Sequence, residues 1–128
     1  MTRIRLHKGD LPADVTFGNS VAVDTETLGL SLVRDKLCVV QLSAGDGTAH
    51  VVQLDRFSYD APNLKALLAD AGVEKMFHFA RFDVAMIQKW FGVTCAPVFC
   101  TKIASKLART YTDRHGLKDV SRELVGVD

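Results

Sequence analysis

The first half of the chain has a pattern of apolar and polar positions that favours β-strands. Apolar, strand-forming residues dominate 20–25, 37–43 and 48–54, which predicts three strands. The residues Gly45-Asp46-Gly47 separate the last two segments and are typical of a tight turn. We therefore expect 37–43 and 48–54 to pair as an antiparallel hairpin.

The second half alternates between helical and extended patterns. Pro62 opens a helical pattern that ends near Gly72, and a short apolar strand is expected at 74–78. Phe82, Met86 and Trp90 recur at helical spacing and predict a helix that ends at Gly92. The remaining expected elements are an extended segment at 97–100 and helices at 101–111 and 116–124. Hairpin strands followed by alternating helices and strands predict an α/β fold, with a mixed sheet and flanking helices.

Composition limits the chain to one domain and excludes a strong global attraction to polyanions. The chain has 128 residues, 48% of them hydrophobic, which suffices for one core, and a net charge of +1. Positive charge is concentrated in residues 101–122, and on the expected helix Lys102, Lys106 and Arg109 share one face. Both a solvated face and a phosphate-contacting face remain open for them.

Cysteine usage and hydropathy indicate the compartment. Cys38, Cys95 and Cys100 are odd in number and lack a Cys-x-x-Cys spacing, which favours a reducing compartment and argues against a zinc site. No apolar stretch approaches membrane-spanning length, and the first residues lack a secretion signal. We expect a cytoplasmic protein that does not associate with membranes.

Two carboxylates follow the first predicted strand. Asp24 and Glu26 come directly after Val21-Ala22-Val23, and because strand side chains alternate, both acids should point to the same face. Like charges at this separation repel each other unless a cation lies between them. A hard divalent metal bound by oxygen ligands is one explanation, and acids that merely face water at a strand end are the other.

A third carboxylate lies on the inward stripe of a predicted helix. Asp83 falls in the first turn, on the same stripe as Ile87 and Phe91. An acid at a helix start can simply interact with the helix dipole. An acid on an apolar face is costly, however, and usually finds a cation, so Asp83 is a candidate third metal ligand.

These residues form two recognisable motifs. Asp-Thr-Glu-Thr-x-Gly after a hydrophobic strand, followed by His-x-x-x-Phe-Asp, resembles the first two exonuclease motifs of the DEDD superfamily of 3′-5′ exonucleases, in its ribonuclease D-like branch. The segments 4–12, 37–43 and 99–107 resemble the nanoRNase C group of small bacterial exoribonucleases. The resemblance extends along essentially the whole chain and implies a ribonuclease H-like fold.

The resemblance also implies roles for the acids. Two divalent ions, Mg²⁺ or Mn²⁺, would be held by Asp24, Glu26 and Asp83. Asp24 would bridge both ions, Glu26 would hold the nucleophile-side ion near the terminal 3′ hydroxyl, and Asp83 would serve the leaving-group side.

Three further residues are implied as substrate contacts. Thr27 and Leu30 stand where relatives contact the terminal nucleotide, Leu30 as an apolar wedge under the base. Phe79 occupies a position where broader relatives tend to have Asn, and its ring could stack on a base instead.

The superfamily's third motif is not found. Downstream of Asp83 there is neither a Tyr-x-x-x-Asp nor a His-x-x-x-x-Asp spacing, because His115 lies four residues after Tyr111 and Val120 five after His115. We therefore expect 1–128 to be a 3′-5′ exonuclease domain that is incomplete at its carboxyl end.

The resulting expectation is a 3′-5′ exoribonuclease that acts on short single-stranded RNA and releases nucleoside 5′-monophosphates. The family resemblance also implies a symmetric homo-oligomer, for which a ring-like octamer is one form. Two alternatives stay open: a general or proofreading exonuclease that also takes single-stranded DNA, and an inactive nucleic-acid-binding or assembly fragment.

Overall fold

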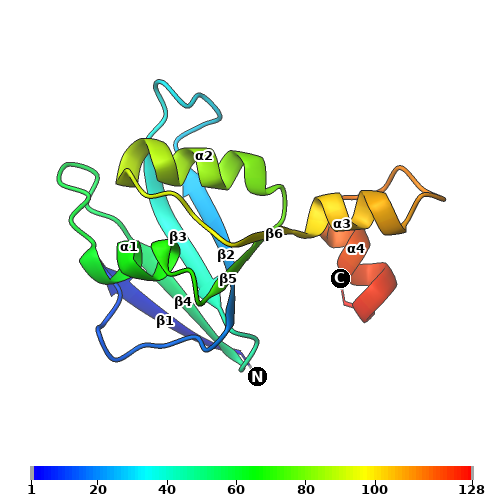
Figure 1. Cartoon of the computed structure of the whole chain (residues 1–128), viewed down its shortest axis with the longest axis horizontal. Coiled ribbons are helices and arrows are strands. Elements are labelled where there is room, and N and C mark those ends of the chain that lie inside the picture. Colours follow the sequence, from blue (N-terminus) through cyan, green and yellow to red (C-terminus); the bar gives the residue numbers. More distant parts are fainter. Residues whose placement is uncertain (1, 128) are drawn as a thin grey trace.

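The computed structural model describes residues 2–127, which form one six-stranded mixed sheet and the helices that flank it (Figure 1). The strands are β1 (Arg3–Lys8), β2 (Ser20–Thr27), β3 (Leu37–Ser43), β4 (Thr48–Gln53), β5 (Glu74–Phe77) and β6 (Val98–Cys100). The helices are α1 (Pro62–Ala69), α2 (Ala80–Phe91), α3 (Thr101–Ala108) and α4 (Leu117–Val125). The α/β class predicted from the sequence is confirmed.

The strands lie in the order β1-β4-β3-β2-β5-β6. β3 pairs antiparallel with both β2 and β4, while β1, β5 and β6 pair parallel to their neighbours. The predicted hairpin is therefore confirmed, and Gly45 and Gly47 in its turn have φ values of 78° and 85° that favour glycine. The expected set of strands lacked β1, whose mostly exposed Arg3–Lys8 segment has too few apolar residues to stand out as an edge strand.

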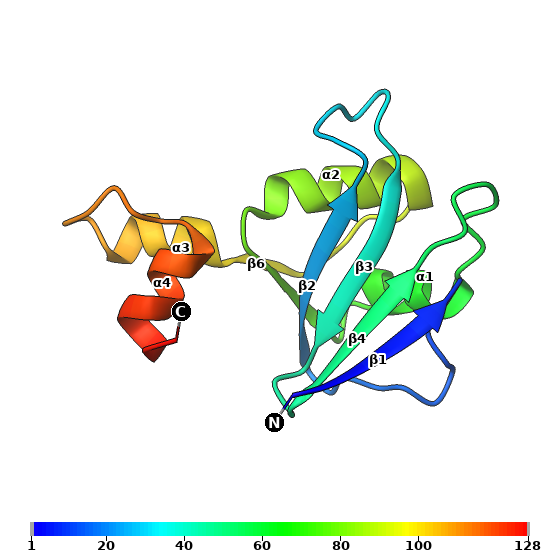
Figure 2. The ribbon, with the colours of Figure 1, turned by 180° about the vertical axis from the view of Figure 1, so that it is seen from behind.

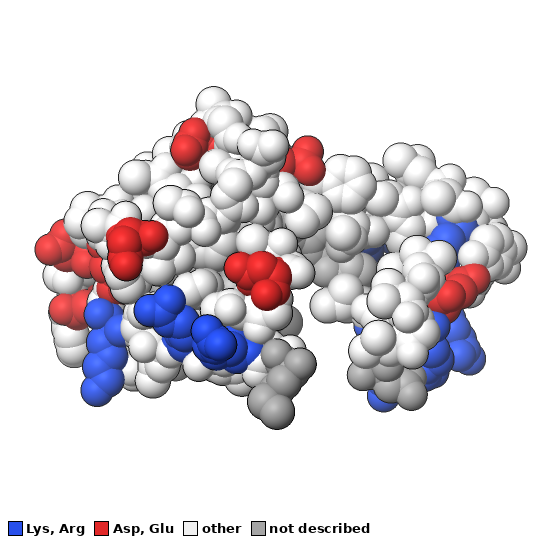
Figure 3. Space-filling model, turned by 90° about the horizontal axis from the view of Figure 1, so that it is seen from below, with Lys and Arg blue, Asp and Glu red and all other residues white. Residues whose placement is uncertain are grey.

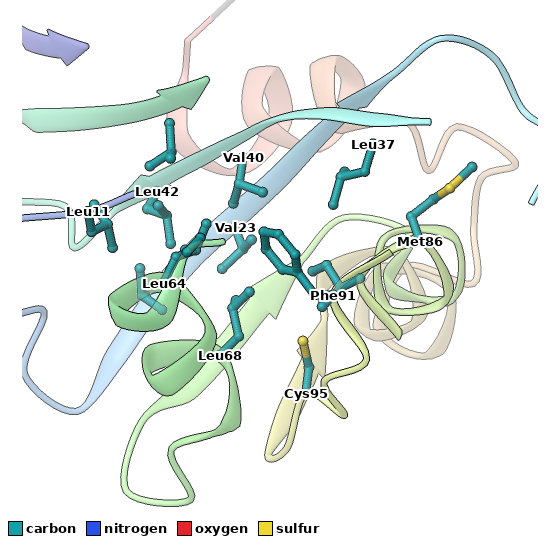
Figure 4. Packing of buried hydrophobic residues seen from close by; sticks show 14 of the residues in the cluster. Leu11, Val23, Leu37, Val40, Leu42, Leu64, Leu68, Met86, Phe91 and Cys95 are labelled. Carbon is teal, nitrogen blue, oxygen red and sulfur yellow. The ribbon is translucent and has the colours of Figure 1, made fainter. Parts of the chain in front are cut away.

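Helices α1 and α2 cover one face of the sheet, and the view from behind shows the opposite face free of both (Figure 2). The core lies between the sheet and these helices, as expected from the inward residues of β2 and the apolar stripe of α2 (Figure 4). Phe91 is buried and Trp90 is half-buried against this core. The central strands and α2 are thus fixed by packing, which gives the acids at their ends a rigid support.

Helices α3 and α4 form an arm that projects beyond β6 (Figures 1 and 2), and the space-filling view shows a hollow between this arm and the sheet (Figure 3). α3 ends at Ala108, three residues earlier than expected. Arg109 follows it and is only 6% exposed, because its guanidinium bonds to the Glu123 carboxylate at 2.6 Å and to the Arg114 carbonyl at 2.7 Å. The prediction that Arg109 shares an accessible basic face with Lys102 and Lys106 is therefore wrong.

Candidate functional site

The two acids of β2 lie on one face of the sheet, as strand alternation predicts. Asp24 and Glu26 are exposed, whereas Thr25 between them is only 7% exposed. Asp24 lines a groove of about 400 Å³ on the open face of the sheet. Residues of β2, β3 and β5 form most of this groove, with Thr101 of α3 and Leu117 of α4 also in its lining.

Asp83 approaches β2 from the other side of the sheet. It lies in the first turn of α2, is 4% exposed, and accepts a hydrogen bond from the Thr25 hydroxyl. Burial raises the pKa of Asp83 to about 6, the Thr25 hydrogen bond partly opposes this shift, and the negative charge of Asp24 adds to it. A carboxylate in this position is costly to ionise unless a cation compensates it.

The donor chemistry of these side chains fits a hard divalent cation. Asp24 and Asp83 interact electrostatically, and both offer carboxylate oxygens of the kind that Mg²⁺ and Mn²⁺ prefer. In the part of the chain that the structure describes, however, no three His, Cys, Asp or Glu side chains come close enough together to hold a metal ion. The described acids therefore provide part of an all-oxygen site, and the joint role of Asp24, Glu26 and Asp83 as ligands stays a prediction.

The loop between β2 and β3 exposes Leu30 to solvent and is stabilised by hydrogen bonds between its own residues. Leu30 is 84% exposed, and the Thr27 hydroxyl donates to the Gly29 carbonyl at 2.6 Å. Asp35 at the far side of the loop accepts a hydrogen bond from the Ser31 amide at 2.9 Å, and the Asp35 carbonyl accepts one from the Trp90 indole at 3.2 Å. A substrate contact at Leu30 would thus stand on a loop anchored to α2.

Phe79 has an unusual backbone conformation at the start of α2. Its φ and ψ are 70° and 57°, in the left-handed region that residues other than Gly, Asn and Asp rarely adopt. Its ring is 46% exposed, and the Lys102 ammonium lies 4.4 Å from the ring centroid. An exposed aromatic in a strained conformation is a feature that packing alone does not explain.

The junctions before α2 and α3 are tied together. The Thr101 hydroxyl donates to the Phe77 carbonyl at 3.1 Å and accepts from His78 Nδ1 at 2.9 Å. The Ala80 amide donates to the Cys100 sulfur at 3.4 Å. Burial, with the nearby positive charge of Lys102, lowers the pKa of His78, so this imidazole is neutral at pH 7 and serves to orient the turn.

Sequence reasoning missed two residues that the structure brings to this site. The Thr25 hydroxyl donates a hydrogen bond to Asp83. The sequence held a signal for this contact, because strand alternation turns Thr25 toward the face of the sheet on which the Asp83 helix packs. Lys102 was placed only on a basic helix face. Its contact with Phe79 joins segments 23 residues apart and has no local signature.

This fold and this arrangement of acids define a class, and comparison with known proteins supports it. Residues 10–128 match the 3′-5′ exonuclease family, and the chain belongs to that family. Its ribonuclease H-like fold and its two acid motifs agree with the DEDD superfamily and the ribonuclease D-like branch, as the sequence predicted.

Individual relatives show which members of this family the chain is similar to. Ribonuclease D of Acidiphilium cryptum is 34% identical over 106 residues, which are 83% of this chain. The structure of Brucella melitensis NrnC with bound Mg²⁺ is 56% identical, with a TM-score of 0.95 over 99% of this chain. The structure of the same Brucella protein bound to pGG gives 56% identity and a TM-score of 0.96 over 100% of this chain. This likeness agrees with the predicted resemblance to the nanoRNase C group.

The chain spans only part of these relatives. It covers 26% of the Acidiphilium ribonuclease D, 64% of the Mg²⁺-bound NrnC chain and 63% of the pGG-bound one. Among residues 2–127, no helix is long and apolar enough to cross a membrane.

Proposed function

We propose that this protein is a 3′-5′ exoribonuclease that hydrolyses the terminal phosphodiester of short RNA and releases nucleoside 5′-monophosphates. The observation that carries the proposal is the arrangement around Thr25. Two exposed carboxylates flank it on β2, and its hydroxyl binds the buried Asp83 from α2. The chain belongs to the 3′-5′ exonuclease family, and by the resemblance described above these acids would be the metal ligands of its first two motifs.

Asp24, Glu26 and Asp83 would hold two divalent ions, Mg²⁺ or Mn²⁺. Such ions, about 4 Å apart, activate a water and stabilise the leaving 3′ oxygen. The relative with bound Mg²⁺ supports this choice of metal. Glu26 is exposed at the end of β2, where it is free to approach the 3′ hydroxyl of a bound strand.

The side chains around these acids suit a small, partly apolar substrate site. Leu30 offers an exposed apolar group for a terminal base, and Thr27 lies at the start of its loop. Phe79 offers an exposed ring for stacking. The net charge of +1 gives little attraction to a long phosphate backbone, and the relative bound to pGG also supports a short substrate.

By the resemblance described above, Asp24, Glu26 and Asp83 would be three of the four carboxylates that the superfamily uses. We therefore propose that residues 1–128 are a portion of the exonuclease domain. A misplaced catalytic group typically lowers rates by about 10²-fold or more, so we expect this chain alone to be at least that much slower than a four-carboxylate DEDD exonuclease. Full activity of the isolated chain would mean that Asp113 or Asp119 supplies the fourth carboxylate.

We further propose a symmetric homo-oligomer. The arm carries exposed apolar side chains, among them Ile103, Leu107 and Leu117, which self-association would remove from water. Sedimentation velocity tests this part separately. A species of single-chain mass at every concentration would contradict it without affecting the enzymatic proposal.

Substrate class is tested by measuring kcat/KM on 3′-hydroxyl RNA and DNA of two to twenty nucleotides. We expect RNA of two to a few nucleotides to be the best substrate. A steady rise of kcat/KM with length would indicate a general exoribonuclease, and equal or higher values for DNA would indicate a general or proofreading exonuclease. Binding without hydrolysis at any length would leave the non-catalytic alternative.

A further inference from the structure

We propose that Lys102 binds a phosphate of the substrate strand and that Phe79 holds its ammonium in place for this contact. The inference rests on the proposed function, because it assigns a further substrate-binding residue to the same site. The test distinguishes failure of this inference from failure of the proposed function. RNA binding by the wild-type protein tests the proposed function, and the comparison of variants tests the role of Lys102.

The first argument is the position of the ammonium. Lys102 Nζ lies 4.4 Å from the centroid of the Phe79 ring, within the roughly 6 Å over which a cation is attracted to an aromatic face. Lys102 lies in the first turn of α3 and is half-buried. The contact therefore holds the ammonium against a residue of a neighbouring element, 23 positions away in the sequence.

The second argument is the rigidity of the support. Phe79 is in the left-handed region with φ of 70°, so the direction in which its side chain leaves the main chain is set by the backbone at the start of α2. The hydrogen bonds from Thr101 to Phe77 and from Ala80 to Cys100 fix the start of α3 against the start of α2. Ring and ammonium are therefore held by two joined helix starts.

The third argument is the location of the pair. Thr101, the residue before Lys102, lines the same groove as Asp24, and so does His78, the residue before Phe79. The ammonium is also close enough to His78 to lower its pKa. A strand whose terminal phosphodiester lies at Asp24 would thus pass beside the Lys102 ammonium. Within residues 2–127 this ammonium contacts the Phe79 ring and forms no ion pair with a carboxylate, which leaves its charge available to a phosphate.

Lys102 differs in this respect from Arg109, which was predicted to share one basic face with Lys102 and Lys106. Arg109 is committed to Glu123 and to the Arg114 carbonyl, which removes its charge from the surface. Lys89 provides a matched control, because its ammonium lies 5.7 Å from the Trp90 ring centroid at the opposite end of α2. It makes the same kind of contact away from the groove.

The test measures binding of a fluorescent RNA trinucleotide with phosphorothioate linkages, which slow hydrolysis, in Mg²⁺ over a range of KCl concentrations. For Lys102→Gln we expect affinity to fall about tenfold and the log–log salt slope to become shallower by about 0.7, the value for one phosphate contact on a single strand. Lys102→Arg should retain most of the affinity and of the salt slope, and Lys89→Gln should change neither the affinity nor the slope.

The role of the ring is separated by Phe79→Leu. This variant keeps the charge but not the aromatic face, so affinity should fall while the salt slope stays at the wild-type value. A wild-type slope for Lys102→Gln, or an equal change of slope for Lys89→Gln, would overturn the inference and leave the proposed function standing. Failure of the wild-type protein to bind any short RNA would count against the proposed function itself.

Discussion

The Thr25 hydroxyl donates a hydrogen bond to the Asp83 carboxylate and so joins β2 to the first turn of α2. Thr25 lies between Asp24 and Glu26, and its side chain points to the opposite face of the sheet from theirs. One three-residue segment therefore presents two carboxylates on the open face and orients a third from the covered face. Any use of the three acids together depends on this contact.

Replacing Thr25 tests that dependence. Thr25→Val keeps the shape of the side chain but removes the donor, so the pKa of Asp83 should rise further above about 6. We expect the metal-free protein at pH 8 to lose about 1–3 kcal/mol of unfolding free energy, the usual cost of removing a hydrogen bond to a buried charge. Thr25→Ser retains the hydroxyl and should lose less. Equal urea midpoints for the two variants would show that the hydrogen bond has no energetic role.

Stability of the metal-free protein should depend on pH through Asp83. Its folded-state pKa of about 6 lies above the ordinary value of about 3.9, so the folded protein binds the proton more tightly than the unfolded chain. The associated stability is fully present below about pH 4 and is lost as pH rises through about 6, and the difference between these two pKa values corresponds to a loss of about 3 kcal/mol.

Asp83→Asn removes this titration. In EDTA at pH 8 the variant should be more stable than the wild type, and the difference should disappear below pH 4. Added Mg²⁺ should stabilise the wild type and have little effect on the variant. Urea unfolding at several pH values provides the measurement, and a wild-type pH profile that Asp83→Asn leaves unchanged would contradict the assignment.

The β2–β3 loop supplies a prediction about Gly29. A Cβ at this position would lie 2.2 Å from the Asp35 carboxylate, which the Ser31 amide holds in place. Gly29→Ala should therefore displace Asp35, lower Tm by roughly 5 °C, a typical shift for a moderate local defect in a domain of this size, and weaken short-RNA binding through Leu30. Adding Asp35→Ala removes the clash, so the double variant should lose less than the sum of the single losses. Strict additivity would show that the two residues do not interfere.

Phe79 offers a prediction that separates stability from binding. Asn adopts the left-handed region more readily than Phe, so Phe79→Asn should change unfolding free energy by less than about 1 kcal/mol although it removes an aromatic ring. RNA affinity should nevertheless fall several-fold, since the ring no longer holds Lys102 or stacks on a base. Phe79→Leu is the control, because Leu tolerates this backbone poorly and should be less stable than Asn. The reverse order of stability would contradict the strain argument.

Local patterns predicted much of the fold. The alternation in β2, the glycine-rich turn before β4 and the two adjoining apolar stripes of α2 each reflect a short-range rule, and each is confirmed. Met86 lies on one of these stripes and Phe91 on the other. The edge strand β1 was absent from the predicted set, because its identity as a strand depends on pairing with β4, 45 residues away in register. The burial of Arg109 was missed for the same reason, since Glu123 belongs to another helix.

The site was predictable to a similar extent. The acids of β2 and the inward position of Asp83 followed from periodicity, whereas the Thr25–Asp83 and Phe79–Lys102 contacts depend on how separate elements meet. Long-range contacts of this kind leave no fixed spacing in the sequence. In this protein, such contacts determine that Thr25 and Lys102 lie beside the acids and their groove.

The central claim is that Asp24 and its partner acids hold divalent ions for hydrolysis from the 3′ end of RNA. The most direct measurement is cleavage of a 5′-end-labelled short RNA in Mg²⁺, with enzyme in excess over substrate so that slow turnover is detected. The wild type should shorten the RNA one nucleotide at a time from its 3′ end, EDTA should stop the reaction, and Asp24→Asn should be slower by at least about 10²-fold while it remains folded. Cleavage by Asp24→Asn at close to the wild-type rate would contradict the account.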